Sequence, residues 1–206
     1  MTPPDWVNWH DDYDRPDSHL GRRLAVVQEA VRSALDSGAE KVVSLCAGQG
    51  RDLLPVLATH PGRDRVRARL VELDPHNAAL AERQAPAGVE VVCGDAAMTD
   101  AYAGAVPADL VIACGIFGNI TEADIRRTVD ILPQLCAPQA TVIWTRHTRP
   151  PDLVPTVCDW FEQRGFTRIS LVTAGFGVGV HRYTGPPAPL RRGERMFTFV
   201  QEETPR

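Results

Sequence analysis

The chain has 206 residues, 44% of them hydrophobic, and predicts a single domain over residues 1–206 with a core of ordinary size. Its formal net charge of −4 and pI near 5.9 exclude a general attraction to nucleic-acid backbones. Five widely spaced cysteines without a C-x-x-C pair predict neither a disulfide framework nor a metal site. The sequence shows no signal peptide and no apolar stretch of membrane-spanning length, so we expect a cytoplasmic protein.

From residue 42 onward, short segments rich in β-branched residues alternate with segments whose apolar residues recur at three- and four-residue steps. This alternation predicts parallel strands joined by right-handed helical crossovers, and therefore an open α/β sheet. We expect strands at 41–46, 66–73, 89–93, 109–114 and 140–145, with helices at 51–60, 76–84, 120–136 and 153–165.

Both ends of the chain depart from this alternation. Near the N-terminus, a helix is expected between Ser18, as its N-cap, and Gly38, just past its end. Near the C-terminus, strands are expected at 167–174 and 195–201 with no helix between them, which predicts an antiparallel pair. The connection between these two strands is long and rich in glycine and proline, so we interpret it as a mobile lid or binding loop.

The expected first strand runs into a glycine-rich turn, "CAGQG", with Gly48 and Gly50 in the bend. In an open parallel sheet, ligands bind beyond the carboxyl ends of the strands, so this turn marks a candidate site. The dinucleotide motif G-x-G-x-x-G is incomplete, because Leu53 stands where its third glycine would be. The sequence also lacks G-x-x-x-x-G-K-[ST], which excludes an ATP site of that kind.

Carboxylates follow the next two expected strands. Glu72 ends the second strand, where it can accept hydrogen bonds from both hydroxyls of a ribose. Asp95 follows the third strand, where it can accept from an adenine amino group while Ala96 offers a backbone N–H. Asp74 instead predicts the N-cap of the next helix. Together these positions predict a site for an adenosine without a phosphate.

In these motifs the chain resembles class I S-adenosylmethionine-dependent methyltransferases. The resemblance runs from about residue 40 to residue 145 and rests on "VVSLCAGQG", "LVELDP", "GDA" and "ADLVIACGIFGNI", in order and with matching spacing. It implies a Rossmann-like methyltransferase fold, with a seven-stranded, mostly parallel sheet, an antiparallel C-terminal strand and helices on both faces. It also implies S-adenosyl-L-methionine as the cofactor.

The resemblance assigns cofactor contacts to individual residues. It places the methionine part of the cofactor against the glycine turn, and its ammonium group against backbone carbonyls after the fourth strand. Two positions depart from the family pattern, because Ser44 replaces a usual acidic residue and Cys46 a usual glycine. The implied cofactor-binding residues are Ala47, Gly48, Gly50, Glu72, Leu73, Asp95, Ala96, Cys114 and Gly115.

The loop at 114–119 lacks the Asn/Asp-Pro-Pro-aromatic motif found in many nucleic-acid and glutamine N-methyltransferases. With the acidic pI, this absence argues against DNA or a large RNA as the acceptor, and we expect a small molecule.

Residues 1–38 combine an aromatic N-terminal arm with the first helix. Two interpretations of the arm stay open, a lid over the active site and a segment packed on the sheet or on the partner of a homodimer. The candidate acceptor contacts in this arm are Trp6, Trp9, His10 and Tyr13.

Two histidines are candidate general bases, since the unperturbed imidazole pKa lies near neutrality. His147 follows the fifth expected strand, where an ordinary polar loop is the alternative, and His181 lies in the long C-terminal connection. Arg146 is a candidate for orienting an acceptor carboxylate, and Phe117 and Asn119 for bordering the acceptor. Methyl transfer can also proceed by positioning alone, so a base is not required.

Three functions stay open at this point. The first is methyl transfer from S-adenosylmethionine to an oxygen, nitrogen or carbon nucleophile of a small metabolite. The second is a cofactor-binding but catalytically silent subunit of a complex, which the unusual Ser44 and the aromatic arm would suit. The third is an NAD-binding oxidoreductase, which the missing third glycine disfavours.

Overall fold

The structure is a computed structural model that describes residues 18–200. Its helices are α2 (His19–Asp36), α3 (Leu54–Thr59), α4 (Pro75–Gln84), α5 (Glu122–Ile131) and α6 (Val154–Gln163). Short 3₁₀ helices lie at η2 (Arg63–Arg65), η3 (Thr99–Tyr102) and η4 (Leu132–Gln134). The strands are β1 (Lys41–Leu45), β2 (Arg67–Glu72), β3 (Val89–Cys93), β4 (Ala108–Ala113), β5 (Cys136–His147), β6 (Phe166–Thr173) and β7 (Phe176–Tyr183).

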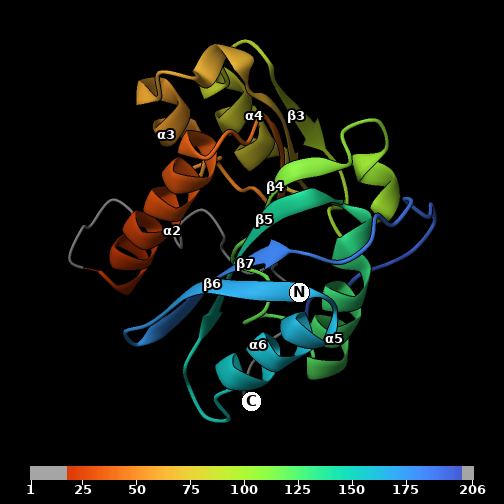
Figure 1. Ribbon diagram of the computed structural model, residues 1–206. Coiled ribbons are helices and arrows are strands. Elements are labelled where there is room, and N and C mark those ends of the chain that lie inside the picture. Colours follow the sequence, from red (N-terminus) through yellow and green to blue (C-terminus); the bar gives the residue numbers. More distant parts are fainter. Residues whose placement is uncertain (1–17, 201–206) are drawn as a thin grey trace.

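The strands form one seven-stranded sheet in the order β3-β2-β1-β4-β5-β7-β6 (Figure 1). The pairs from β3 through β5 are parallel, and β7 is antiparallel to both of its neighbours. This order reverses between β1 and β4, so the carboxyl ends of these two strands flank a topological switch point, where open α/β sheets bind ligands. The predicted seven-stranded, mostly parallel sheet with an antiparallel C-terminal strand is confirmed.

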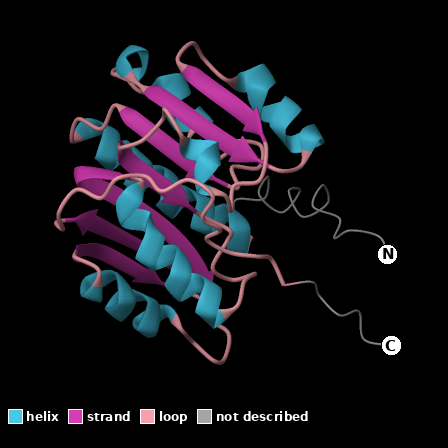
Figure 2. Cartoon of the chain, turned by 90° about the vertical axis from the view of Figure 1, so that its right-hand side faces the viewer, coloured by secondary structure: helices cyan, strands magenta, loops and turns pink. Residues whose placement is uncertain are grey.

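Helices cover both faces of the sheet (Figure 2). One apolar core joins α2, α3 and α4 to the sheet, and the other joins α5 and α6 to its opposite face. Central strand residues such as Val43 and Val111 are fully buried. Strands that are covered on both faces read as continuous apolar runs, which is why the sequence pattern located them. Among the described residues, no helix combines the length and apolarity needed to cross a bilayer.

Local capping chemistry sets several helix boundaries. The Ser18 side chain accepts from the backbone N–H of Gly21 at 2.9 Å, and Gly38 follows α2 with φ +98°. Asp74 Oδ1 accepts from the backbone N–H groups of His76 and Asn77 at 2.8 and 2.9 Å at the start of α4. The predicted caps at both helices are therefore confirmed.

The C-terminal region differs from its prediction. Residues 176–183, expected within a mobile loop, form β7, which pairs with β5 on one side and β6 on the other. Residues 195–201 were expected to form a strand, but from Arg195 to Val200 the chain makes only two isolated bridges, Met98↔Arg195 and Ile120↔Phe199. The predicted antiparallel pair exists, but β6 and β7 form it as a tight hairpin.

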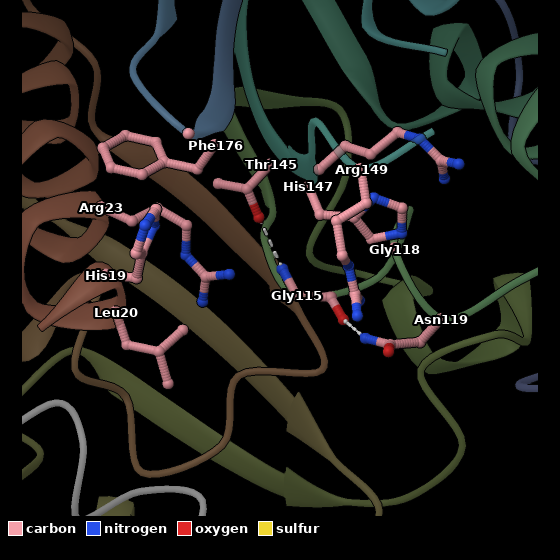
Figure 3. Close-up of a pocket in the computed structure, with 12 residues that line it drawn as sticks. His19, Leu20, Arg23, Gly115, Gly118, Asn119, Thr145, His147, Arg149 and Phe176 are labelled. Atoms are coloured by element: carbon pink, nitrogen blue, oxygen red, sulfur yellow. Dashed lines mark hydrogen bonds between the residues drawn. The ribbon is translucent and has the colours of Figure 1, made fainter. Parts of the chain in front are cut away.

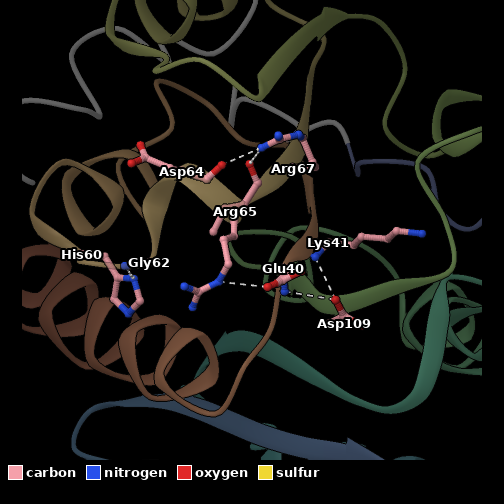
Figure 4. A network of polar contacts seen from close by, with 9 residues as sticks. Glu40, Lys41, His60, Gly62, Asp64, Arg65, Arg67 and Asp109 are labelled. Carbon is pink, nitrogen blue, oxygen red and sulfur yellow. Dashed lines mark hydrogen bonds and ion pairs between the residues drawn. The ribbon is translucent and has the colours of Figure 1, made fainter.

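A polar network lies at the amino ends of β1 and β2, away from the switch point (Figure 4). Asp109 Oδ2 accepts from the backbone N–H groups of Glu40 and Lys41 at 3.0 and 2.8 Å. Arg65 pairs with Glu40 at 3.0 Å, and Arg67 donates to the Asp64 carbonyl at 2.9 Å. Arg65 and Arg67 have partners within the chain, so the amino ends of β1 and β2 do not form a free cationic patch.

Candidate functional site

The glycine turn after β1 has unusual backbone angles. Cys46, Gly48 and Gly50 all have positive φ, at 49°, 55° and 74°. Left-handed angles are costly for residues with a Cβ, so Cys46 is the strained member of the turn. At Gly50, a Cβ would come within 2.5 Å of Leu54 Cδ1, so the Leu54 side chain would have to move. Gly50 is therefore favoured both by its angle and by this close side-chain packing.

Glu72, the last residue of β2, connects the glycine turn to the next loop. Its Oε2 accepts from the backbone N–H of Gly48 at 2.7 Å, and its Oε1 accepts from that of Asp74 at 2.9 Å. Each carboxylate oxygen can accept more than one hydrogen bond, so the group keeps capacity for a ligand. Leu73 follows directly and is 65% exposed. A large apolar side chain held open beside a carboxylate fits the face and the hydroxyls of a nucleoside.

Asp95 lies in the loop after β3 and has two partners. Its Oδ1 accepts from the backbone N–H of Ala97 at 2.9 Å, and its Oδ2 pairs with Arg195 at 2.9 Å. The sequence did not indicate this ion pair, because Arg195 is distant along the chain. Ala96, the other predicted contact in this loop, is buried.

The C-terminal segment 191–200 lies across the loops that follow β3 and β4. Thr99 N donates to the Glu194 carbonyl, Met196 N donates to the Ala97 carbonyl and Val200 N donates to the Asn119 carbonyl. The segment thus reaches from the loop that carries Asp95 to the loop that borders the pocket described next.

The loop after β4 is fixed from two sides. Gly115 N donates to Thr145 Oγ1 at 2.9 Å, and Asn119 Nδ2 donates to the Gly115 carbonyl at 2.8 Å. Cys114 is buried, and burial raises the pKa of its thiol. Gly115 has φ +74°, and a Cβ there would meet no atom within 4 Å. Its backbone therefore borders open space at the switch point.

A pocket of about 520 Å³ opens at this loop, within the usual range for small-molecule sites (Figure 3). Figure 3 shows His19 and Arg23, from the first turns of α2, facing His147 and Arg149, from the end of β5, across Gly115. Each of these two walls thus contributes an arginine and a histidine side chain to the pocket. The lining residues are His19, Leu20, Arg23, Gly115, Gly118, Asn119, Thr145, Arg146, His147, Arg149, Gly175 and Phe176.

Arg146 and His147 are the last residues of β5 and line this pocket together with Asn119 and Gly115, and their roles in binding and catalysis stay predictions. Burial lowers the pKa of His147 first, and the charges of Arg146 and Arg149 lower it further. Contact with the Gly118 backbone and the charge of Asp152 oppose this shift. The imidazole is therefore neutral at pH 7, which is the protonation state that a general base requires.

Two predicted site residues do not reach the pocket. His181 is 0% exposed in the middle of β7, where its Nδ1 accepts from Trp144 Nε1 at 3.1 Å and its ring stacks on Phe161. Phe117 is also fully buried and packs against the same two aromatic rings. Both residues belong to the core, so the prediction of His181 as a general base and that of Phe117 at the border of the acceptor are wrong. The predicted contacts Trp6, Trp9, His10 and Tyr13 lie outside the described residues.

Sequence reasoning missed the α2 wall of the pocket. His19 and Arg23 are four residues apart at the start of α2, so they point from the same face of the helix. The charge of Arg23 also acts on Asp52, whose pKa is raised chiefly by burial and lowered in part by this arginine. The i, i+4 spacing was visible in the sequence, but only the packing of α2 beside β7 directs this face to the pocket.

No family model and no curated protein sequence matches the chain. Among solved structures, an O-methyltransferase family protein from Burkholderia thailandensis is 16% identical with a TM-score of 0.66, over 86% of this chain and 59% of that one. This chain therefore matches less than two thirds of that protein's length.

Two similar structures have ligands bound. The N-methyltransferase NodS from Bradyrhizobium japonicum, in complex with S-adenosyl-L-homocysteine, is 15% identical with a TM-score of 0.62, over 84% of this chain and 92% of that one. Magnesium protoporphyrin IX methyltransferase from Synechocystis, with bound S-adenosylmethionine, is 12% identical with a TM-score of 0.63, over 88% and 92%. Together with the strand order, these likenesses show that the chain has the Rossmann-like fold of class I S-adenosylmethionine-dependent methyltransferases.

Proposed function

We propose that the protein transfers a methyl group from S-adenosylmethionine to a small-molecule acceptor. The observation that carries this proposal is the arrangement at the carboxyl ends of β1, β2 and β3. There a glycine turn, the Glu72 carboxylate, the exposed Leu73 and the Asp95 carboxylate follow three neighbouring strands. This set offers acceptors and an apolar face to an adenosine, and it offers no phosphate-binding loop.

The described residues fit the cofactor along its length. Glu72 would accept from the ribose hydroxyls, Leu73 would cover the adenine face, and Asp95 with Ala96 would meet the adenine edge. Ala47, Gly48 and Gly50 would line the methionine part. The carbonyls of Cys114 and Gly115 would receive the ammonium group, and the Gly115 carbonyl keeps one lone pair beyond its bond to Asn119. Arg23, on the pocket wall formed by α2, has the charge that the methionine carboxylate requires.

When bound, the cofactor would supply an electrophilic methyl carbon on a sulfonium, for transfer to the nucleophile of the acceptor. The protein's part is positioning and, where the nucleophile carries a proton, removal of that proton. His147 is the candidate for the second role, because its neutral ring lines the pocket. Asn119 borders the same space.

The pocket of about 520 Å³ would hold the methionine end of the cofactor at Gly115 and Arg23, and its wall at the end of β5 supports a metabolite-sized acceptor beside it. The net charge of −4 gives no support to a nucleic-acid acceptor. A cytoplasmic location stays a prediction. No structural observation favours the silent subunit or the oxidoreductase.

Calorimetric titration with S-adenosylhomocysteine, beside NADH, tests the proposal. We expect micromolar binding of the first ligand alone, and methyl transfer once an acceptor is supplied. Binding of NADH without S-adenosylhomocysteine would overturn the assignment of the cofactor. Binding of S-adenosylhomocysteine without turnover on any member of a broad acceptor panel would point instead to the silent subunit.

A further inference from the structure

The ionisable side chains that line the pocket are all basic. Arg23, Arg146 and Arg149 contribute three guanidinium groups, and His19 and His147 add two imidazoles. Within the described part of the chain, no aspartate or glutamate lines the pocket. A pocket for a neutral acceptor has no need of this charge, and bringing like charges together costs free energy.

Arg146 is the most buried of these cations, at 8% exposure. Its Nη1 donates to the Phe117 carbonyl, while its Nε has no hydrogen-bond partner among the described residues. Burial without a counter-ion opposes the charged form and lowers the pKa of the guanidinium. Nevertheless, an arginine remains charged at neutral pH, so its positive charge persists inside the protein.

The surrounding carboxylates do not neutralise Arg146. Asp152 and Glu122 act on it through space and raise its pKa, whereas Arg149 lowers it. Among residues 18–200, Arg146 forms no ion pair within 4.0 Å, and Asp152 instead accepts from the backbone N–H of Val154 at 3.0 Å. A buried charge is normally paired, so Arg146 can accept an anionic partner from outside the described residues.

We propose that the acceptor is an organic carboxylate and that Arg146 and Arg149 bind its carboxylate group. This inference rests on the proposed function, in which Arg23 is matched to the carboxylate of the cofactor and the two arginines after β5 stay available. The planar guanidinium fork matches the two oxygens of a carboxylate. Leu20 and Phe176, which also line the pocket, provide apolar surface for the rest of the acceptor.

The test compares matched neutral and anionic probes on the protein saturated with S-adenosylhomocysteine. The pairs are benzoate with benzamide, and 4-hydroxybenzoate with 4-hydroxybenzamide, and binding is measured by ligand-observed NMR titration. We expect each carboxylate to bind about tenfold or more tightly than its amide, as a charge-assisted hydrogen bond implies. If no carboxylate outbinds its amide, the proposal is overturned.

Variants locate the effect. In Arg146→Gln and in Arg149→Gln, the preference for the carboxylate should be lost while the affinity for S-adenosylhomocysteine is unchanged. Arg149 is exposed, so its variant should fold even if the buried substitution does not. Arg65→Gln is the matched control, because Arg65 pairs with Glu40 at the amino ends of the strands, whereas the pocket lies at their carboxyl ends. A preference that survives in Arg149→Gln and in any folded Arg146 variant would overturn the proposal.

Two further outcomes separate this inference from its alternatives. Phenyl phosphate binding about tenfold more tightly than benzoate would overturn the carboxylate assignment in favour of a phosphate. Carboxylate binding to a protein that does not bind S-adenosylhomocysteine would support the anion site and reject the proposed function. Binding of S-adenosylhomocysteine without any preference for carboxylates would support the proposed function and reject the anion site.

Discussion

Glu72 and Gly48 are 24 residues apart in sequence, yet Glu72 Oε2 accepts from the Gly48 backbone N–H at 2.7 Å. The carboxylate therefore shapes the glycine turn and also faces the space where a ribose would bind. These two roles cannot be separated by removing the side chain, because both depend on the same oxygens.

Replacing Glu72 with alanine should weaken binding of S-adenosylhomocysteine by about a hundredfold, since at least two charge-assisted hydrogen bonds are lost. Calorimetric titration measures the change. Glu90→Ala is the control, because Glu90 lies on the adjacent strand and pairs with Arg69 outside the site. Wild-type affinity in Glu72→Ala would contradict the assigned ribose contact.

Arg195 pairs with the Asp95 carboxylate at 2.9 Å, where an adenine amino group would also donate. The two side chains are partly exposed, so the pair is weak and competes only mildly. Arg195→Ala should therefore increase the affinity for S-adenosylhomocysteine about two- to fivefold. The wild-type affinity should rise with salt concentration, which screens the ion pair, and that dependence should be smaller in the variant. A decrease in the affinity of the variant would show that Arg195 supports the cofactor site instead.

The parallel half of the sheet was predictable because its signals are local. Apolar runs, helical periodicity and caps such as Ser18 and Asp74 lie within short stretches of sequence. The carboxyl-end positions of Glu72 and Asp95 followed from the order of strands and helices alone. Their partners were not predictable, since the Arg195–Asp95 pair joins residues that only the tertiary fold brings together.

The strand β7 was missed for a tertiary reason. Its two glycines suggested mobility, but a Cβ at Gly177 would lie 2.7 Å from Val154 Cγ2, and one at Gly179 would lie 2.3 Å from Trp144 Cε2. Both glycines thus make room for side chains from α6 and β5, and no local pattern shows this need. The same error placed His181 in a loop and suggested a catalytic role for a core residue.

Cys46 has φ +49°, in the left-handed region that glycine adopts without strain. Left-handed angles cost a residue with a Cβ roughly 1 kcal/mol, which glycine does not incur. Cys46→Gly should therefore be more stable than Cys46→Ala by about 1 kcal/mol in urea unfolding. Both variants remove the thiol, so the difference between their unfolding free energies reports the cost of the backbone angle at this position. Equal stabilities would show that the turn relaxes without strain.

His147 has a pKa lowered by burial and by Arg146 and Arg149. If this ring is the base, the neutral form acts, and that form persists on acidification until the pH reaches the lowered pKa. The acidic limb of kcat/KM should therefore have its midpoint below pH 6.5. Arg149→Gln removes a positive neighbour and should move that midpoint to higher pH. A midpoint that does not respond to Arg149→Gln would exclude His147 as the titrating group.

The buried pair Trp144–His181 makes stability depend on pH. Burial, with a smaller contribution from Arg168, lowers the pKa of His181 to about 4. Protonation would turn the acceptor of the Trp144 N–H into a donor, so the folded protein resists it. The unfolded chain takes up the proton near pH 6.5 and the native chain only near pH 4, so this contribution to stability is complete above pH 6.5 and is lost as the pH falls through that window.

The expected loss between pH 7 and 4.5 is about 2 to 3 kcal/mol of unfolding free energy from this group alone. Urea unfolding across that range measures it as the difference in slope between the wild type and His181→Gln. The glutamine variant lacks this titration, so its stability should fall less on acidification, whatever its stability at pH 7. His76→Gln is the control, because His76 is exposed and its variant should follow the wild-type curve. Parallel curves for the wild type and His181→Gln would show that the buried ring does not control the acid sensitivity.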